Sequence, residues 1–135
     1  MKIKCLLVMP GVEVQNVRIP ANYKFIKSLI GENLGSIKLK DNALIILNRN
    51  PQEDSFNRVL GDKVIRGAFL VIGTKKDYRK SLNKKQTRKY SNMFKLKKHE
   101  KKITEMRDEY YRAYYTELQK KYLQEYKPEY YAKVA

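Results

Sequence analysis

The chain contains 135 residues, 42% of them hydrophobic, and carries 30 Lys and Arg against 14 Asp and Glu, which gives a formal net charge of +16. This length and apolar content suit one modest hydrophobic core, and no apolar run approaches the roughly 18–20 residues that a transmembrane helix requires. The positive charge favours a polyanionic partner: nucleic acid, an anionic membrane or an acidic protein surface.

Cys5 is the single cysteine, so no internal disulfide can form and a reducing compartment is expected. It lies in an apolar run, which predicts a buried and unreactive thiol. That run has five residues before Pro10-Gly11, too few for the apolar region of a secretory leader, which needs about seven to fifteen. We therefore expect a cytoplasmic protein.

The first part of the chain predicts a hairpin followed by a short helix. Apolar residues in 3–9 and 12–19, separated by the Pro-Gly break, are spaced like two strands. Asn22 is a plausible N-cap, the apolar residues of 25–30 have helical spacing, and Gly31 is placed to end the helix.

The next segments predict further strands. Residues 36–39 and 43–47 flank Asp41-Asn42, which favours a hairpin turn because both residues tolerate a left-handed backbone. The run GAFLVIG at 67–73 is apolar and rich in β-forming residues, so we expect it to be a central strand.

Residues 75–102 predict a basic helix, because they hold thirteen Lys and Arg against two Asp and Glu, and no Gly or Pro interrupts 82–102. Ser81 is the candidate N-cap. Helical spacing gathers Leu82, Tyr90, Met93, Phe94 and Leu96 on one side. The other side is basic and carries Lys84, Arg88 and Lys95, with Lys85 beside them.

Residues 103–135 have no net charge and hold eight of the eleven tyrosines. A stripe at helical spacing predicts a long helix over about 100–127, closed by Pro128. Tyrosine is an effective interface residue, so the stripe predicts a homodimer or a partner contact through Tyr110, Tyr111, Tyr114, Tyr115, Leu118 and Tyr122. The alternative is that the stripe packs back on the sheet.

Four segments follow one another in a characteristic order: PG (10–11), SLIG (28–31), FNRVLGDKVIRGAFLVIG (56–73) and SLNKKQTRKYSNMF (81–94). This order resembles a small domain family of mobile genetic elements, domain of unknown function 3846. The resemblance implies an α+β fold and a phage or plasmid origin, and it supplies no catalytic residues. It departs at Gly31-Glu32, where the family usually has two glycines. We therefore expect an α+β domain over 1–94 and a helical extension over 95–135.

The basic helix predicts a nucleic-acid surface, because cations along one helix face can neutralise successive phosphates. The candidate phosphate contacts are Lys84, Lys85, Arg88, Lys95, Lys97 and Lys98. Tyr78 is the candidate for stacking on an exposed base. The alternative is a solvated helix whose charges only maintain solubility.

Asn57-Arg58 lies between two apolar runs, near the turn at Gly61-Asp62. Arg58, together with Arg66, is the candidate for a pocket that holds a phosphate or carboxylate. The alternative is that Arg58 fixes a loop by donating hydrogen bonds to backbone carbonyls.

Enzyme and metal motifs are not recognisable in the sequence. His99 is the single histidine, and it has no second His or Cys at ligand spacing. Glu53, Asp54 and Asp62 form no metal-loop pattern. We expect neither catalysis nor a metal or cofactor.

These features together predict a non-enzymatic accessory protein of a phage or plasmid that binds DNA or RNA in the host cytoplasm. One alternative is an anti-defence inhibitor, for example an anti-CRISPR protein, that docks on a nuclease or its guide RNA. Another is a sponge for nucleotide signals with a pocket at Arg58 and Arg66. Membrane binding is not expected, because the basic helix has no spare apolar face to insert.

Overall fold

The computed structural model describes residues 2–50, 56–61, 63–75, 78–98 and 100–101. These residues form an antiparallel sheet with two helices, so the expected α+β class is confirmed for this part of the chain. The tyrosine-rich helix expected further on lies outside the described residues.

The main sheet has six strands, in the order β2-β1-β7-β4-β3 with β8 also pairing with β7. The strands are β1 (Lys2–Val8), β2 (Gln15–Pro20), β3 (Leu34–Leu39), β4 (Ala43–Asn48), β7 (Phe69–Lys75) and β8 (Tyr78–Lys80). A separate hairpin consists of β5 (Phe56–Leu60) and β6 (Lys63–Arg66). The helices are α1 (Tyr23–Ile30) and α2 (Lys84–Met93).

The predicted hairpins are confirmed. β1 pairs with β2 and β3 pairs with β4, both antiparallel. Asp41 and Asn42 have φ values of 60° and 57°, which is the left-handed turn conformation expected of a tight hairpin. β7 lies between β1 and β4, as expected for a central strand.

The short helix α1 begins and ends where the sequence predicts. The Asn22 side chain accepts a hydrogen bond from the Phe25 N–H at 2.7 Å, and the Gly31 N–H donates to the Lys27 carbonyl at 2.8 Å. Gly31 has φ 141°, and a Cβ there would lie 2.9 Å from Asn48 Nδ2. Glycine is therefore required for both conformation and space.

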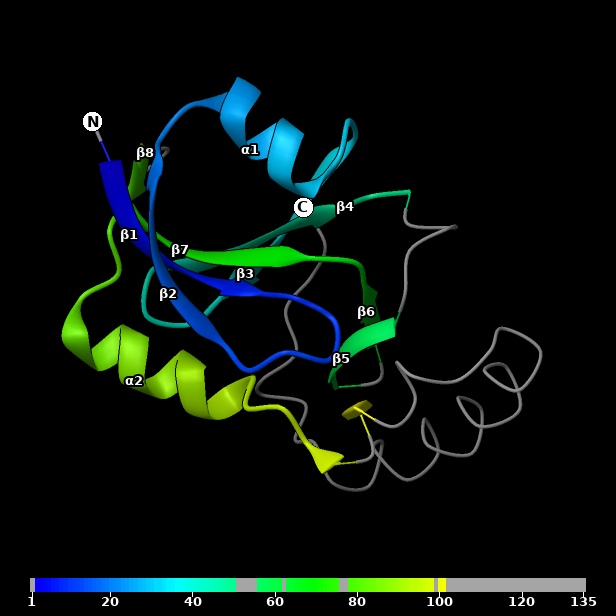
Figure 1. The fold of residues 1–135 in the computed structure, drawn as a ribbon. Helices are drawn as coiled ribbons and strands as arrows, with labels where there is room; N and C mark the ends of the chain where they lie inside the picture. The colour runs from blue at the N-terminus through cyan, green and yellow to red at the C-terminus, as the bar shows by residue number, and fades with distance from the viewer. Residues whose placement is uncertain (1, 51–55, 62, 76–77, 99, 102–135) are drawn as a thin grey trace.

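The two helices cover opposite faces of the sheet (Figure 1). Side chains alternate between the faces along each strand, so β1 sends Leu6 and Val8 to the core beneath α2 and the β5–β6 hairpin. The same strand sends Cys5 to the core beneath α1. As expected, the Cys5 thiol is buried, and burial raises its pKa to about 11.

The basic helix differs from the prediction, because α2 spans Lys84–Met93 rather than 82–102. Its N-cap is Asn83 instead of Ser81, and a capping box joins Asn83 to Gln86 in both directions. The Ser81 hydroxyl instead accepts a hydrogen bond from the Lys4 N–H at 2.9 Å. The helix ends at its C-cap Phe94.

Candidate nucleic-acid interface

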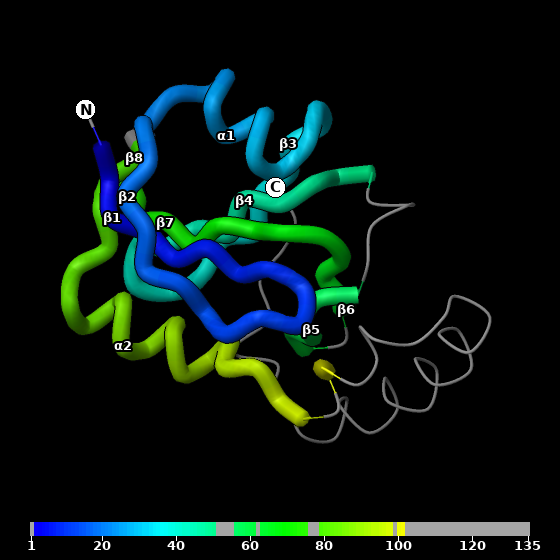
Figure 2. Tube along the Cα trace, in the orientation of Figure 1, coloured from blue at the N-terminus to red at the C-terminus, as the bar shows by residue number. Residues whose placement is uncertain are grey.

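A groove of about 590 Å³ lies between α2 and the β1–β2 ribbon, where α2 runs alongside these strands (Figure 2). Its charged lining residues are Lys4 and Arg18 from the sheet and Lys84 and Arg88 from α2. All four are exposed. No Asp or Glu of the described residues lines the groove. The groove is therefore positively charged along both the sheet and the helix.

The strand register places the two cations of the sheet together. Lys4 and Arg18 are direct partners in the β1–β2 pairing. Lys4 shares its face of β1 with Leu6 and Val8, which pack beneath α2. Asn16, opposite Leu6, extends the same row and also lines the groove. Like charges directly opposite each other destabilise a sheet, so this pair does not contribute to the stability of the ribbon.

The helix α2 supplies the other wall of the groove. Lys84, Thr87 and Arg88 stand at positions i, i+3 and i+4, which lie on one side of a helix, and all three line the groove. Gln86 and Tyr90 are buried against the core. The first turn of α2 has no acidic residue, so the positive end of the helix dipole adds to the charge of the groove.

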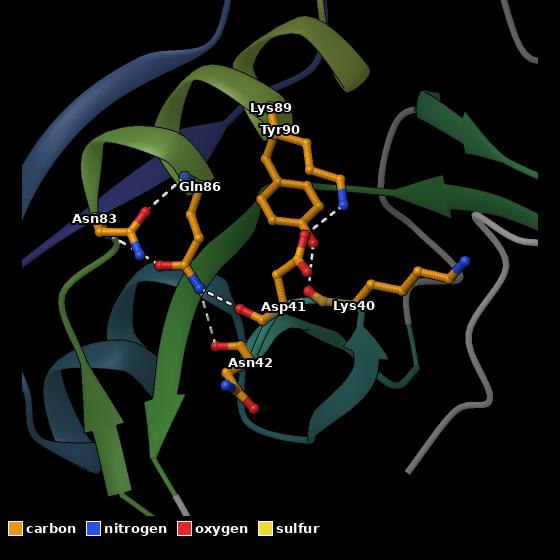
Figure 3. A network of polar contacts seen from close by, with 7 residues as sticks. All are labelled: Lys40, Asp41, Asn42, Asn83, Gln86, Lys89 and Tyr90. Atoms are coloured by element: carbon orange, nitrogen blue, oxygen red, sulfur yellow. Dashed lines mark hydrogen bonds and ion pairs between the residues drawn. The ribbon is translucent and has the colours of Figure 1, made fainter.

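Three side chains of α2 hold the helix to the turn between β3 and β4 (Figure 3). The Tyr90 hydroxyl donates to the Lys40 carbonyl at 2.5 Å, and the Gln86 amide donates to the Asp41 carbonyl. Lys89 Nζ lies 2.6 Å from Asp41 Oδ2. The hydrogen bond from Lys89, followed by its charge, lowers the pKa of the Asp41 carboxyl. These contacts fix the helical wall of the groove.

The segment before α2 is bonded to the strand that carries Lys4. The Leu82 N–H donates to the Lys4 carbonyl at 3.0 Å. Gly73 of β7 makes room for this segment, since a Cβ there would lie 2.7 Å from the Ser81 carbonyl oxygen. The sheet wall and the helix wall of the groove are thus bonded to each other near the N-terminus of α2.

Arg58 joins the far end of α2 to the loop between β1 and β2. It is only 1% exposed. Its Nε donates to the Phe94 carbonyl at 2.9 Å, and its Nη2 donates to the Val12 carbonyl at 2.6 Å. Its Nη1 donates to Asn57 Oδ1 at 2.8 Å. These contacts match the alternative in which Arg58 fixes a loop by donating hydrogen bonds to backbone carbonyls.

A guanidinium that is buried and bonded in this way is not open to an anion in solution, so we place no anion pocket at Arg58. Arg66, its predicted companion, is half-buried at the end of β6, opposite Phe56. Neither arginine lines the groove described above.

Glu100 is a buried carboxylate that the sequence did not identify. It is 1% exposed, and it accepts hydrogen bonds from the Val59 N–H at 3.3 Å and the Lys97 N–H at 3.0 Å. Burial raises the pKa of this carboxyl, although the two N–H groups and the Arg58 charge act in the opposite direction. A lone acid within a basic run gives no sequence signal of burial.

The raised pKa of Glu100 predicts a pH dependence of folding. The Glu100 carboxyl makes its full contribution to stability below the pKa that it has in the unfolded chain. This contribution is lost as the pH rises through the higher pKa that the same carboxyl has in the folded protein. Between about pH 4 and pH 7, wild type should therefore lose more unfolding free energy than Glu100→Gln. Urea unfolding of both proteins across this range measures the difference. Parallel pH profiles would contradict the prediction.

The structure brings only part of the predicted phosphate surface together. Lys84 and Arg88 line the groove. Lys85 is exposed on α2, and its charge also lowers the pKa of the Asp41 carboxyl. The remaining three, Lys95, Lys97 and Lys98, come after the end of α2 and are not on its face.

The aromatic candidates are placed as far as the structure describes them. Tyr78 belongs to β8, where its backbone pairs with Lys75. The predicted partner surface from Tyr110 to Tyr122 lies outside the described residues.

Sequence reasoning missed Lys4 and Arg18. Their signal was present in the predicted first hairpin, in which both residues alternate with apolar neighbours. Pairing that hairpin in register would have placed them opposite each other. Their closeness to α2 had no local signal, because it depends on how the helix packs on the sheet.

Within the described ranges, no group of three or more His, Cys, Asp or Glu side chains is arranged to hold a metal ion. In the same part of the chain, neither helix has the length and apolar character needed to cross a membrane.

Comparison with known proteins gave one result. A family model described as Domain of unknown function (DUF3846) matches residues 1–95. All four groove cations lie within this span. Searches of curated proteins and of solved structures gave no significant match.

Proposed function

Because the chain belongs to the family described as Domain of unknown function (DUF3846), a description that names no activity, we propose a function from the groove itself. The protein binds the phosphate backbone of nucleic acid between α2 and the β1–β2 ribbon. One observation carries this proposal: Lys4, Arg18, Lys84 and Arg88 line a single groove that contains no carboxylate of the described residues.

The carboxylates that the structure describes are engaged elsewhere. Glu13 accepts from the Leu96 N–H, Glu32 pairs with Lys27, Asp41 pairs with Lys89, and Glu100 accepts from the Val59 N–H. The groove cations therefore have no acidic side chain of the described residues among them, which supports an external anion as their counter-charge.

The four cations suit phosphate in two ways. The guanidinium groups of Arg18 and Arg88 can donate pairs of parallel hydrogen bonds to phosphate oxygens, whereas the ammonium groups of Lys4 and Lys84 act as point charges. Their contacts displace the counterions of the nucleic acid, which drives binding. Contacts to phosphate position a ligand and carry no direct sequence information, so the binding is tolerant of sequence.

An accessory role for a phage or plasmid would use this binding directly. An anti-defence role would use the same groove to hold the guide RNA of a host nuclease, and the same charges would be required. A pull-down with and without nuclease treatment separates the two roles, because a protein partner that survives the treatment supports the second.

Salt dependence tests the proposal. Four phosphate contacts to a single strand predict that log K falls with log[salt] with a slope of about −2.8. Anisotropy of a labelled single strand, measured with the full chain across a salt series, gives the slope. A peptide nucleic acid of the same sequence has no phosphates and should not bind. An affinity independent of salt, or equal for the two ligands, would reject phosphate-backbone binding.

A further inference from the structure

The arrangement of the groove cations restricts the shape of the ligand. Lys4 and Arg18 extend from the sheet, and Lys84 and Arg88 extend from the helix packed beside it. Cations on a flat or convex surface would meet a ligand from one side only. In this groove they line an open-sided volume from two elements, so a ligand inside it contacts both best when it offers negative charge toward both.

A duplex does not meet this requirement. The inner side of each of its backbones is covered by sugars and paired bases, so its phosphates are offered from the outer side only. The groove of the protein has a volume of about 590 Å³, within the range of about 300–1,000 Å³ that is usual for small-molecule pockets. Such a volume accommodates a short length of one sugar-phosphate chain.

The uncharged residues that line the groove favour contact with the sugar-phosphate backbone of a nucleic acid rather than with its bases. Asn16 offers an amide that can hydrogen-bond to phosphate or sugar oxygens. The Thr87 hydroxyl donates its hydrogen to the Asn83 carbonyl at 2.9 Å, so toward the groove it can accept from a sugar hydroxyl. No aromatic side chain of the described residues lines the groove, so this part of the chain offers no platform for base stacking there.

We infer that the groove is specific for single-stranded nucleic acid, whose sugar-phosphate chain lies between α2 and the β1–β2 ribbon with its bases turned outward. This inference rests on the proposed function and names its ligand class. DNA and RNA share the recognised chemistry, so both are tested.

The experiment compares three probes of about 20 nucleotides on the full chain at one salt concentration: a single strand as DNA or RNA, the blunt duplex of the same sequence, and an abasic strand. Because the duplex offers phosphates to one wall only, we expect it to bind at least about 10-fold more weakly than the single strand, a difference of about 1.4 kcal/mol. The abasic strand should stay within about 3-fold of it, because phosphate contacts do not need bases.

A matched pair of double variants connects this preference to the groove. Lys84→Glu with Arg88→Glu should remove the difference between single strand and duplex. Lys24→Glu with Lys38→Glu, which changes the same number of charges at exposed residues of α1 and β3, should keep it.

The outcomes separate this inference from the proposed function. Equal, salt-sensitive binding of single strand and duplex would overturn the single-strand preference and leave phosphate binding intact. A loss of more than about 10-fold for the abasic strand would overturn backbone recognition, because base contacts of the kind worth about 1–3 kcal/mol each would then dominate. Failure of all three probes to bind would reject both proposals.

Discussion

Reversing two groove charges, as Lys84→Glu with Arg88→Glu, is expected to weaken binding of a labelled single strand by about 100- to 200-fold. Each lost hydrogen bond to a charged group contributes roughly 1.5–3 kcal/mol, and two such losses at the lower end reach this range. The salt slope should become shallower by about 1.4, because two phosphate contacts are removed. Anisotropy titrations across a salt series measure both quantities.

The control for this prediction is Lys24→Glu with Lys38→Glu. Both residues are exposed, and they lie in α1 and in the strand β3, at the opposite edge of the sheet from β2. At physiological salt, charges more than about 8 Å from the ligand are largely screened, so this variant should bind nearly as well as wild type. An equal loss in both variants would show that net charge, rather than the groove, determines affinity.

Replacing Arg58 with Met is expected to lower the free energy of unfolding by about 3–5 kcal/mol, the usual effect of removing one partner of a buried charged group. The change leaves the Phe94 and Val12 carbonyls without their donor. It also removes the positive charge that favours the ionised form of the buried Glu100. Urea unfolding followed by circular dichroism measures the effect on the full chain.

Two further variants keep this prediction testable if Arg58→Met fails to fold. Arg58→Lys retains the charge and loses the planar fork of donors, so it should lie between wild type and Arg58→Met in stability. Arg18→Met removes an exposed arginine of β2 and should change stability by no more than about 0.5 kcal/mol, while weakening binding. Wild-type stability in both Arg58 variants would contradict the role of this side chain.

The elements that sequence predicted correctly have local signals. The turn at Asp41-Asn42 depends on two adjacent residues that tolerate positive φ. The helix α1 depends on a cap at Asn22 and a terminating Gly31, only a few residues from the bonds they make. In each case the interaction that decides the structure joins residues only a few positions apart in the sequence.

The extent of α2 could not be predicted in the same way. No Gly or Pro follows Met93 before residue 102, so local propensity continues the helix. In the folded chain the Phe94 carbonyl instead accepts a hydrogen bond from Arg58, 36 residues earlier, and the Leu96 N–H donates to Glu13, 83 residues earlier. Tertiary contacts overrode propensity here.

The groove combines both situations. Lys84 and Arg88 follow from helical spacing, which is a local pattern. Lys4 and Arg18 join them only because β1 pairs with β2 and α2 packs beside that ribbon. Clusters of this kind depend on the packing of distant segments, so charge counting along the sequence identifies one wall and misses the other.

The most direct measurement is a titration of the isotope-labelled full chain with a short single strand, followed by amide chemical shifts. Binding in the groove predicts that the largest changes occur at Lys4, Asn16, Arg18, Thr87 and Arg88, with small changes along α1 (Tyr23–Ile30). Changes concentrated on α1, or spread evenly over the exposed lysines, would contradict the assignment of this groove as the nucleic-acid site.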